Sequence, residues 1–170
     1  MIRWLGFVMI VGGASAAGIL MATGVKRSLI LYQQSIAALV YMKNEIEFQL
    51  TPIDKIAFEL GNRLDAPLSS VFRALYSAIH FVPGIPLGLQ MQHALAQTTQ
   101  SFPLELKRTL TSLFDLLGKQ DMLAQIRAIN LAEERLNQEI QRLNAEKKER
   151  TRAYRTIGMC AGLALAVILI

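Results

Sequence analysis

Residues 122–156 contain neither glycine nor proline, and their apolar positions recur in steps of three and four. Such spacing places the apolar side chains on one stripe of a helix: Ile126, Ile129, Ala132, Leu136, Ile140 and Leu143. A basic run follows, and after Arg155 the chain carries no charged side chain. We therefore expect one helix, about 75 Å long at 1.5 Å per residue, that begins in a globular core, crosses solvent and ends in lipid. Gly118 and Asp121 precede it as the expected stop and N-cap.

Both ends of the chain are apolar. Residues 4–25 are uncharged and long enough to cross the ~30 Å hydrocarbon core of a bilayer. The uncharged residues 156–170 reach only about 22 Å, so a shallow or tilted insertion is the alternative to a full span. These ends explain why 52% of the residues are hydrophobic and the mean hydropathy is +0.33. The sequence thus predicts an N-terminal transmembrane helix (1–25), a cytoplasmic helical bundle (26–150) and a basic flank with a short C-terminal transmembrane helix (151–170).

Basic residues set the expected orientation. Lys26 and Arg27 follow the first apolar segment, and the run ending at Arg155 precedes the second. Because basic flanks stay on the cytoplasmic side, both place the intervening residues in the cytoplasm. A cleaved signal peptide ending near residues 14–16 is the alternative for the first segment, and the Lys-Arg pair directly after it opposes that interpretation.

Small residues one helical turn apart occur in both predicted spans. Gly12 and Ala16 form such a pair in the first, and Gly158 and Gly162 in the second. Pairs of this kind let helices approach closely in lipid, although small residues are also common in spans generally. We expect them to pack the two spans against each other or against other membrane subunits.

Residues 26–117 read as five helices separated by breaks. The first continues the N-terminal span to Leu50, and its inward stripe includes Tyr32, Leu39, Met42, Ile46 and Leu50. Thr51 and Pro52 then form the expected cap and first turn of the second helix. Further breaks fall at residues 65–67, at the apolar loop 81–86 and at 101–103. With the long terminal helix, the sequence predicts an all-α bundle of about six helices.

No constellation for chemistry is present. His80 and His93 are isolated from other metal ligands, and a structural role is favoured for both. Cys160 lies in the last apolar segment without a base beside it. The basic run lacks interleaved aromatic residues, so lipid headgroups are its expected partner rather than nucleic acid. The sequence predicts no enzymatic activity, no cofactor and no metal.

Glu45 is the one unusual charge. It shares a second, otherwise apolar face of the first helix with Ala38, Tyr41 and Phe48. One interpretation pairs it with a lysine or arginine inside the bundle, and this is favoured. The other makes Tyr41, Glu45 and Phe48 a docking surface whose register the carboxylate sets.

The order of these features resembles the stage III sporulation protein AB family. The matching residues are Glu45-Ile46, Thr51-Pro52-Ile53, Leu117-Gly118, Asp121 and Gln125, followed by the aromatic-basic stretch 154–158 before the last span. The chain departs from the family pattern at Phe114, Gln120 and Gln90-Met91.

The resemblance implies a membrane component of the channel between mother cell and forespore. Its cytoplasmic domain would resemble the platform proteins of type II secretion and type IV pilus machines, and would dock a cytoplasmic ATPase-like protein. Other channel subunits, the bilayer and further copies of the chain are the remaining expected partners. The alternative is a platform-like protein of a secretion or pilus machine outside sporulation; a membrane enzyme is disfavoured. Stoichiometry and the ATPase contact residues do not follow from the sequence.

Overall fold

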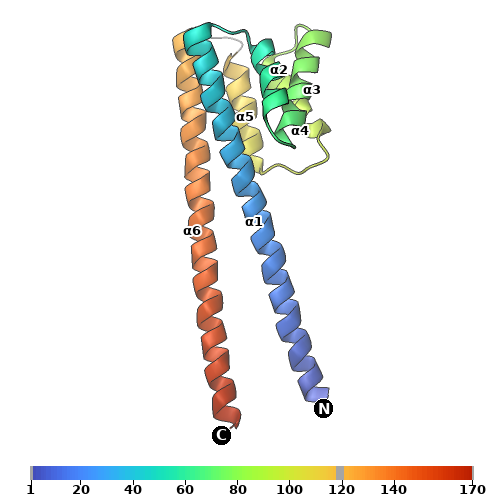
Figure 1. Ribbon diagram of the computed structural model, residues 1–170, viewed down its shortest axis with the longest axis vertical. Helices are drawn as coiled ribbons and strands as arrows, with labels where there is room; N and C mark the ends of the chain where they lie inside the picture. The colour runs from blue at the N-terminus through green and yellow to red at the C-terminus, as the bar shows by residue number, and fades with distance from the viewer. Residues whose placement is uncertain (1, 118–120, 170) are drawn as a thin grey trace. The chain divides into compact units, whose positions relative to one another are not determined.

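The computed structural model describes the backbone of residues 2–117 and 121–169, and the side chains of residues 26–117 and 121–149. Within these residues the regular structure consists of six α-helices (Figure 1). They are α1 (Ile2–Gln49), α2 (Ile53–Arg63), α3 (Leu68–Phe81), α4 (Leu87–Gln97), α5 (Leu104–Leu117) and α6 (Met122–Leu169). The predicted all-α bundle is thereby confirmed, as are the two long terminal helices.

The chain divides into two units. One comprises Met1–Arg27 and Ile140–Ile170, and the other comprises Ser28–Glu139. In the described part of the chain, no helix is both long and apolar enough to cross a membrane. The predicted spans, 1–25 and 151–170, fall on residues whose side chains lie outside that description, together with Gly12, Ala16, Gly158, Gly162 and Cys160.

The unit of residues 28–139 has a leucine-rich core. α2 packs on α3, α3 on α4, and α4 on α5, each pair joined by a short connection. The predicted stripes are buried at most of their positions, including Tyr32, Leu39 and Met42 of α1 and Ile129 and Leu136 of α6. Phe72 of α3 meets Phe114 of α5 with ring centroids 6.3 Å apart. Because Leu136 is fully buried, α6 still belongs to the packed core at that residue.

Two of the predicted helix starts have different outcomes. Asp121 caps α6, since its Oδ1 accepts a hydrogen bond from the backbone N–H of Ala124 at 3.0 Å. The predicted cap of α2 by Thr51 is wrong. The N-cap position of α2 is Pro52, which has no capping side chain, and Thr51 lies one residue earlier, where its hydroxyl donates to Glu45.

Glycines permit two of the close helix contacts. A Cβ on Gly61 of α2 would lie 2.8 Å from the Cγ of Arg73, whose Nε donates to the Gly61 carbonyl at 2.8 Å. A Cβ on Gly88 of α4 would lie 2.8 Å from the Cβ of Asp115 and 3.1 Å from its Cα. α4 can therefore lie against α5 at this point only because residue 88 has no side chain.

Leu113 and Leu116 test this core on a single helix. Leu113 is buried and Leu116 is exposed on α5. We expect Leu113→Ala to lower the free energy of unfolding by about 2–5 kcal/mol, because it removes packed side-chain atoms and leaves a cavity. Leu116→Ala is the matched control and should cost less than half as much in chemical denaturation. Equal costs for the two substitutions would contradict this packing of α5.

Candidate docking surface

The corner between α1 and α2 is built by Glu45. The backbone N–H of Thr51 donates to the Glu45 carbonyl at 3.1 Å, which turns the chain back over the end of α1. The Thr51 hydroxyl donates to Glu45 Oε2 at 2.7 Å, and the Gln49 amide donates to Oε1 at 3.3 Å. The backbone and the side chain of Glu45 thus both hold the turn. The Glu45 carboxylate is satisfied by neutral hydrogen-bond donors and does not require a positively charged partner.

Tyr41 extends this cluster toward α2. Its phenol hydrogen-bonds to the Glu45 carboxylate, and burial followed by this hydrogen bond raises the pKa of Tyr41 above its usual value of 10.0. The Arg63 guanidinium lies over the Tyr41 ring, 4.8 Å from its centroid, and pairs with Glu59 at 3.2 Å. α1 and α2 are therefore joined by a cation–π contact as well as by the turn.

Two large apolar side chains project from the same corner. Phe48 is 77% exposed and Leu50 is 72% exposed. Leu50 also has a φ of +53°, in the left-handed region that residues with a Cβ adopt at a cost of about 1–2 kcal/mol. Glycine would fit this helix C-terminus without strain. Backbone strain of this kind clusters at functional sites, which makes this corner a candidate site.

The predicted docking residues have mixed positions. Tyr41 and Glu45 are half-buried and bonded to each other, whereas Phe48 faces solvent. Ala38, which the docking interpretation places on the same face, is buried in the core. The lysine or arginine expected beside Glu45 is replaced by the Thr51, Gln49 and Tyr41 donors. Glu45 therefore positions the corner, and Phe48 supplies its exposed surface.

Leu50 was expected in the inward stripe of α1. It lies instead one residue past the helix end, where the turn directs it outward. The break at Thr51-Pro52 was visible in the sequence, but the left-handed conformation before it was not, because leucine rarely adopts it.

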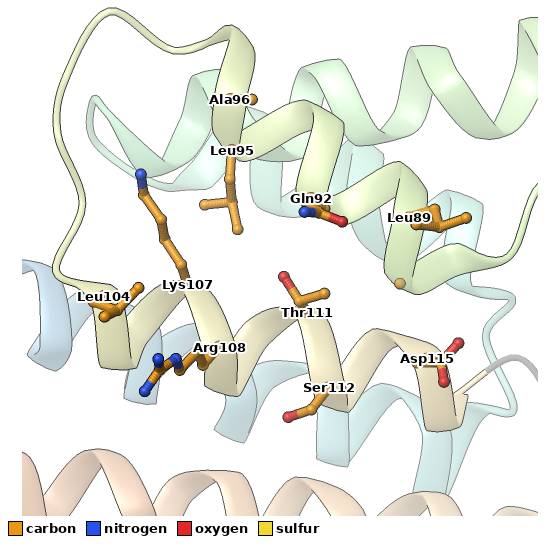
Figure 2. Close-up of a pocket in the computed structure, with 11 residues that line it drawn as sticks. Leu89, Gln92, Leu95, Ala96, Leu104, Lys107, Arg108, Thr111, Ser112 and Asp115 are labelled. Atoms are coloured by element: carbon orange, nitrogen blue, oxygen red, sulfur yellow. The ribbon is translucent and has the colours of Figure 1, made fainter.

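A second concave surface lies between α4 and α5 (Figure 2). It is an open groove of about 800 Å³, and its side chains belong to residues 88–96 and 104–115. Lys107 and Arg108 lie at one end with Leu104, and Asp115 lies at the other with Leu89. Nothing in the sequence indicated this groove, since it depends on how closely Gly88 lets the two helices approach at one end.

The remaining sequence predictions concern other parts of the chain. Pro52 directly precedes α2, and Gln125 lies in the first turn of α6, where its N–H donates to the Asp121 carbonyl at 2.9 Å. Gly118 lies outside the described residues.

His80 is exposed beside Tyr76, with ring centroids 4.8 Å apart. Among residues whose side chains are described, no group of three or more His, Cys, Asp or Glu could hold a metal ion.

Comparison with known proteins identifies the family. The chain matches the family model of stage III sporulation protein AB over residues 3–170. A solved structure titled stage III sporulation protein AB (SpoIIIAB) superposes on it with a TM-score of 0.65 and 20% sequence identity. That match covers 72% of this chain and 98% of the solved one, and at this identity it shows a shared fold. No protein of curated function matches the chain at a significant level. Since the family model spans nearly the whole sequence, the chain belongs to the stage III sporulation protein AB family.

Proposed function

We propose that this chain is a non-enzymatic membrane component of the channel between mother cell and forespore, and that its helical domain docks a cytoplasmic ATPase-like protein. Family membership supports a role in sporulation and favours it over a secretion or pilus machine elsewhere. The observation that carries the docking proposal is the exposed, strained Leu50 beside the exposed Phe48. Exposed aromatic and aliphatic side chains on a rigid support are typical anchors of protein interfaces.

Glu45 is the positioning residue of this surface. Its carboxylate accepts a hydrogen bond from the Thr51 hydroxyl in the turn and another from the Tyr41 phenol of α1. The corner is therefore rigid before any partner arrives, so less conformational entropy is lost on binding. The proposed contact with the partner is made by Phe48 and Leu50, while Tyr41 and Glu45 keep these two side chains in place.

Membrane topology provides one test of this proposal. The proposed location of the helical domain is the mother-cell cytoplasm, and its cytoplasmic orientation is supported by Lys26 and Arg27 on one side and the basic residues within 147–155 on the other. In a Cys160→Ser background, cysteines at the exposed Gln33 and Gln141 should resist a membrane-impermeant thiol reagent in intact cells and react after lysis. Labelling in intact cells would contradict both this orientation and the membrane topology on which docking depends.

Two substitutions of Leu50 separate its effect on stability from its effect on partner binding. We expect Leu50→Gly to raise the free energy of unfolding by about 0.5–1 kcal/mol, because glycine adopts φ of +53° without strain. The same substitution should weaken co-purification of the full chain with its ATPase-like partner. Leu50→Ala is the matched control: it also removes the apolar side chain but keeps the strain, so binding should fall without a gain in stability. If Leu50→Gly is stabilised and binds the partner normally, the corner is not the docking surface.

Phe48 provides an independent measure of the same surface. Its exposed ring contributes little to folding, so Phe48→Ala should change stability by no more than about 0.5 kcal/mol. Affinity for the partner should nevertheless fall about tenfold or more, as for an aromatic anchor of an interface. The exposed Phe81 at the end of α3 is the control, and Phe81→Ala should leave binding unchanged.

Substitutions at Glu45 and Glu47 test whether Glu45 supports the fold of the corner. Glu45→Lys removes the acceptor of Thr51 and Tyr41, and we expect the free energy of unfolding to fall by about 1–3 kcal/mol. The exposed Glu47→Lys makes the same charge change two residues later and should leave stability nearly unaltered. A Glu45→Lys protein as stable as wild type would show that the hydrogen bonds of the corner do not hold it.

A further inference from the structure

The groove between α4 and α5 has opposite charges at its two ends. On α5, Arg108 and Asp115 are seven residues apart, about 10.5 Å along a helix, and both line the groove (Figure 2). Lys107 adds a second positive charge beside Arg108, and Arg108 forms an exposed ion pair with Glu105 one turn away. Between the charged ends the lining is mixed, with apolar Leu95 and Ala96 and polar Gln92, Thr111 and Ser112, while Leu104 and Leu89 add apolar surface at the two ends.

The outer face of α6 carries the matching pattern. Leu123 and Leu131 are 60% and 48% exposed, and Arg127 and Glu134 are exposed beside them. At about 100° per residue these four side chains fall within about 80° of one another around the helix axis. Arg127 and Glu134 are again seven residues apart, in the same order of charge as Arg108 and Asp115, so the two helices are complementary only when antiparallel.

The polar contacts of this α6 face stay within α6. Arg127 Nε donates to the Leu123 carbonyl at 3.3 Å, and the Gln138 amide donates to Glu134 Oε1 at 3.4 Å. Such exposed contacts along one helix are weak and are readily exchanged for a partner. The face therefore combines two exposed leucines with a positive and a negative charge that can pair elsewhere.

We propose that this α6 face of one copy (Leu123, Arg127, Leu131 and Glu134) occupies the α4–α5 groove of a second copy. α6 then lies antiparallel to α5 of the second copy, so that Arg127 faces Asp115 and Glu134 faces Arg108. Leu131 lies between these pairs and contacts the apolar part of the groove. A parallel arrangement would place Arg127 against Arg108 and Glu134 against Asp115, and the like charges exclude it.

This contact joins two different surfaces, so it is heterologous. Each copy retains one unused groove and one unused α6 face, and further copies add in the same way until a rotation closes them into a ring. The inference goes beyond the proposed function and is independent of it, because it uses α4, α5 and α6 and no residue of the corner between α1 and α2.

Cysteine cross-linking of the full chain in its membrane tests this contact. In a Cys160→Ser background, one tagged chain carries Leu131→Cys and a second, differently tagged chain carries Ser112→Cys, an exposed residue of the groove. Mild oxidation should yield a disulfide between the two tags. Lys55→Cys, exposed on α2, replaces Leu131→Cys in the control pair and reports random collision. A yield no higher than that of the control pair would overturn the proposal.

Charge exchange tests the orientation. Arg127→Glu in the Leu131→Cys chain should lower the cross-linking yield about fivefold, and Asp115→Arg in the Ser112→Cys chain should restore it. Lack of restoration overturns the assigned pairing, provided that both chains keep the wild-type circular dichroism melting curve. If Asp115→Arg does not fold, the exposed pair Glu134→Arg and Arg108→Glu provides the same exchange, and lack of restoration there has the same meaning.

Discussion

The Glu45 carboxylate is the contact on which the corner between α1 and α2 depends. It accepts hydrogen bonds from the hydroxyl of Thr51, the amide of Gln49 and the phenol of Tyr41, while its own carbonyl accepts the Thr51 N–H. A half-buried carboxylate with several donors is stabilised without a salt bridge. Because these bonds fix the chain on both sides of Leu50, they can hold that residue in a conformation that it would otherwise avoid. The exposed apolar surface of the corner follows from this one cluster.

Much of the fold could be predicted from the sequence. Breaks at Pro52, Pro67, Pro86 and Pro103 separate helices whose apolar positions recur every three to four residues, and burial of one stripe per helix leaves few alternatives to a bundle. The Asp121 cap could also be predicted, because a carboxylate just before a helical pattern has a local partner in the backbone. These features depend on residues close together in the sequence.

The candidate site was only partly predictable, for a physical reason. The pattern singled out Glu45 and Phe48, but the docking interpretation grouped Ala38 with them, and Ala38 is buried. The pattern also placed Leu50 in the inward stripe, and Leu50 is exposed. A helical wheel gives the angle of each side chain and not the elements that cover it. The Thr51 hydroxyl has two possible partners, a backbone N–H of α2 that would donate to it and the Glu45 carboxylate that accepts from it, and only the folded turn brings the second within 2.7 Å. The groove is less predictable still, since it arises from the approach of α4 to α5 at Gly88.

The two proposed surfaces have a joint consequence, because they lie on different helices. Self-association through the α4–α5 groove and the α6 face uses no residue of the corner, so every copy in an assembly would still present Phe48 and Leu50. Two exposed side chains form a small contact and support only modest affinity alone. When the contact is repeated across joined copies, each further contact forms at a high effective concentration, and the total affinity exceeds that of one corner by orders of magnitude. A partner that is itself oligomeric would then be retained by the assembly and released by separated copies. Substitutions in the groove should therefore weaken retention of such a partner even though they contact it nowhere.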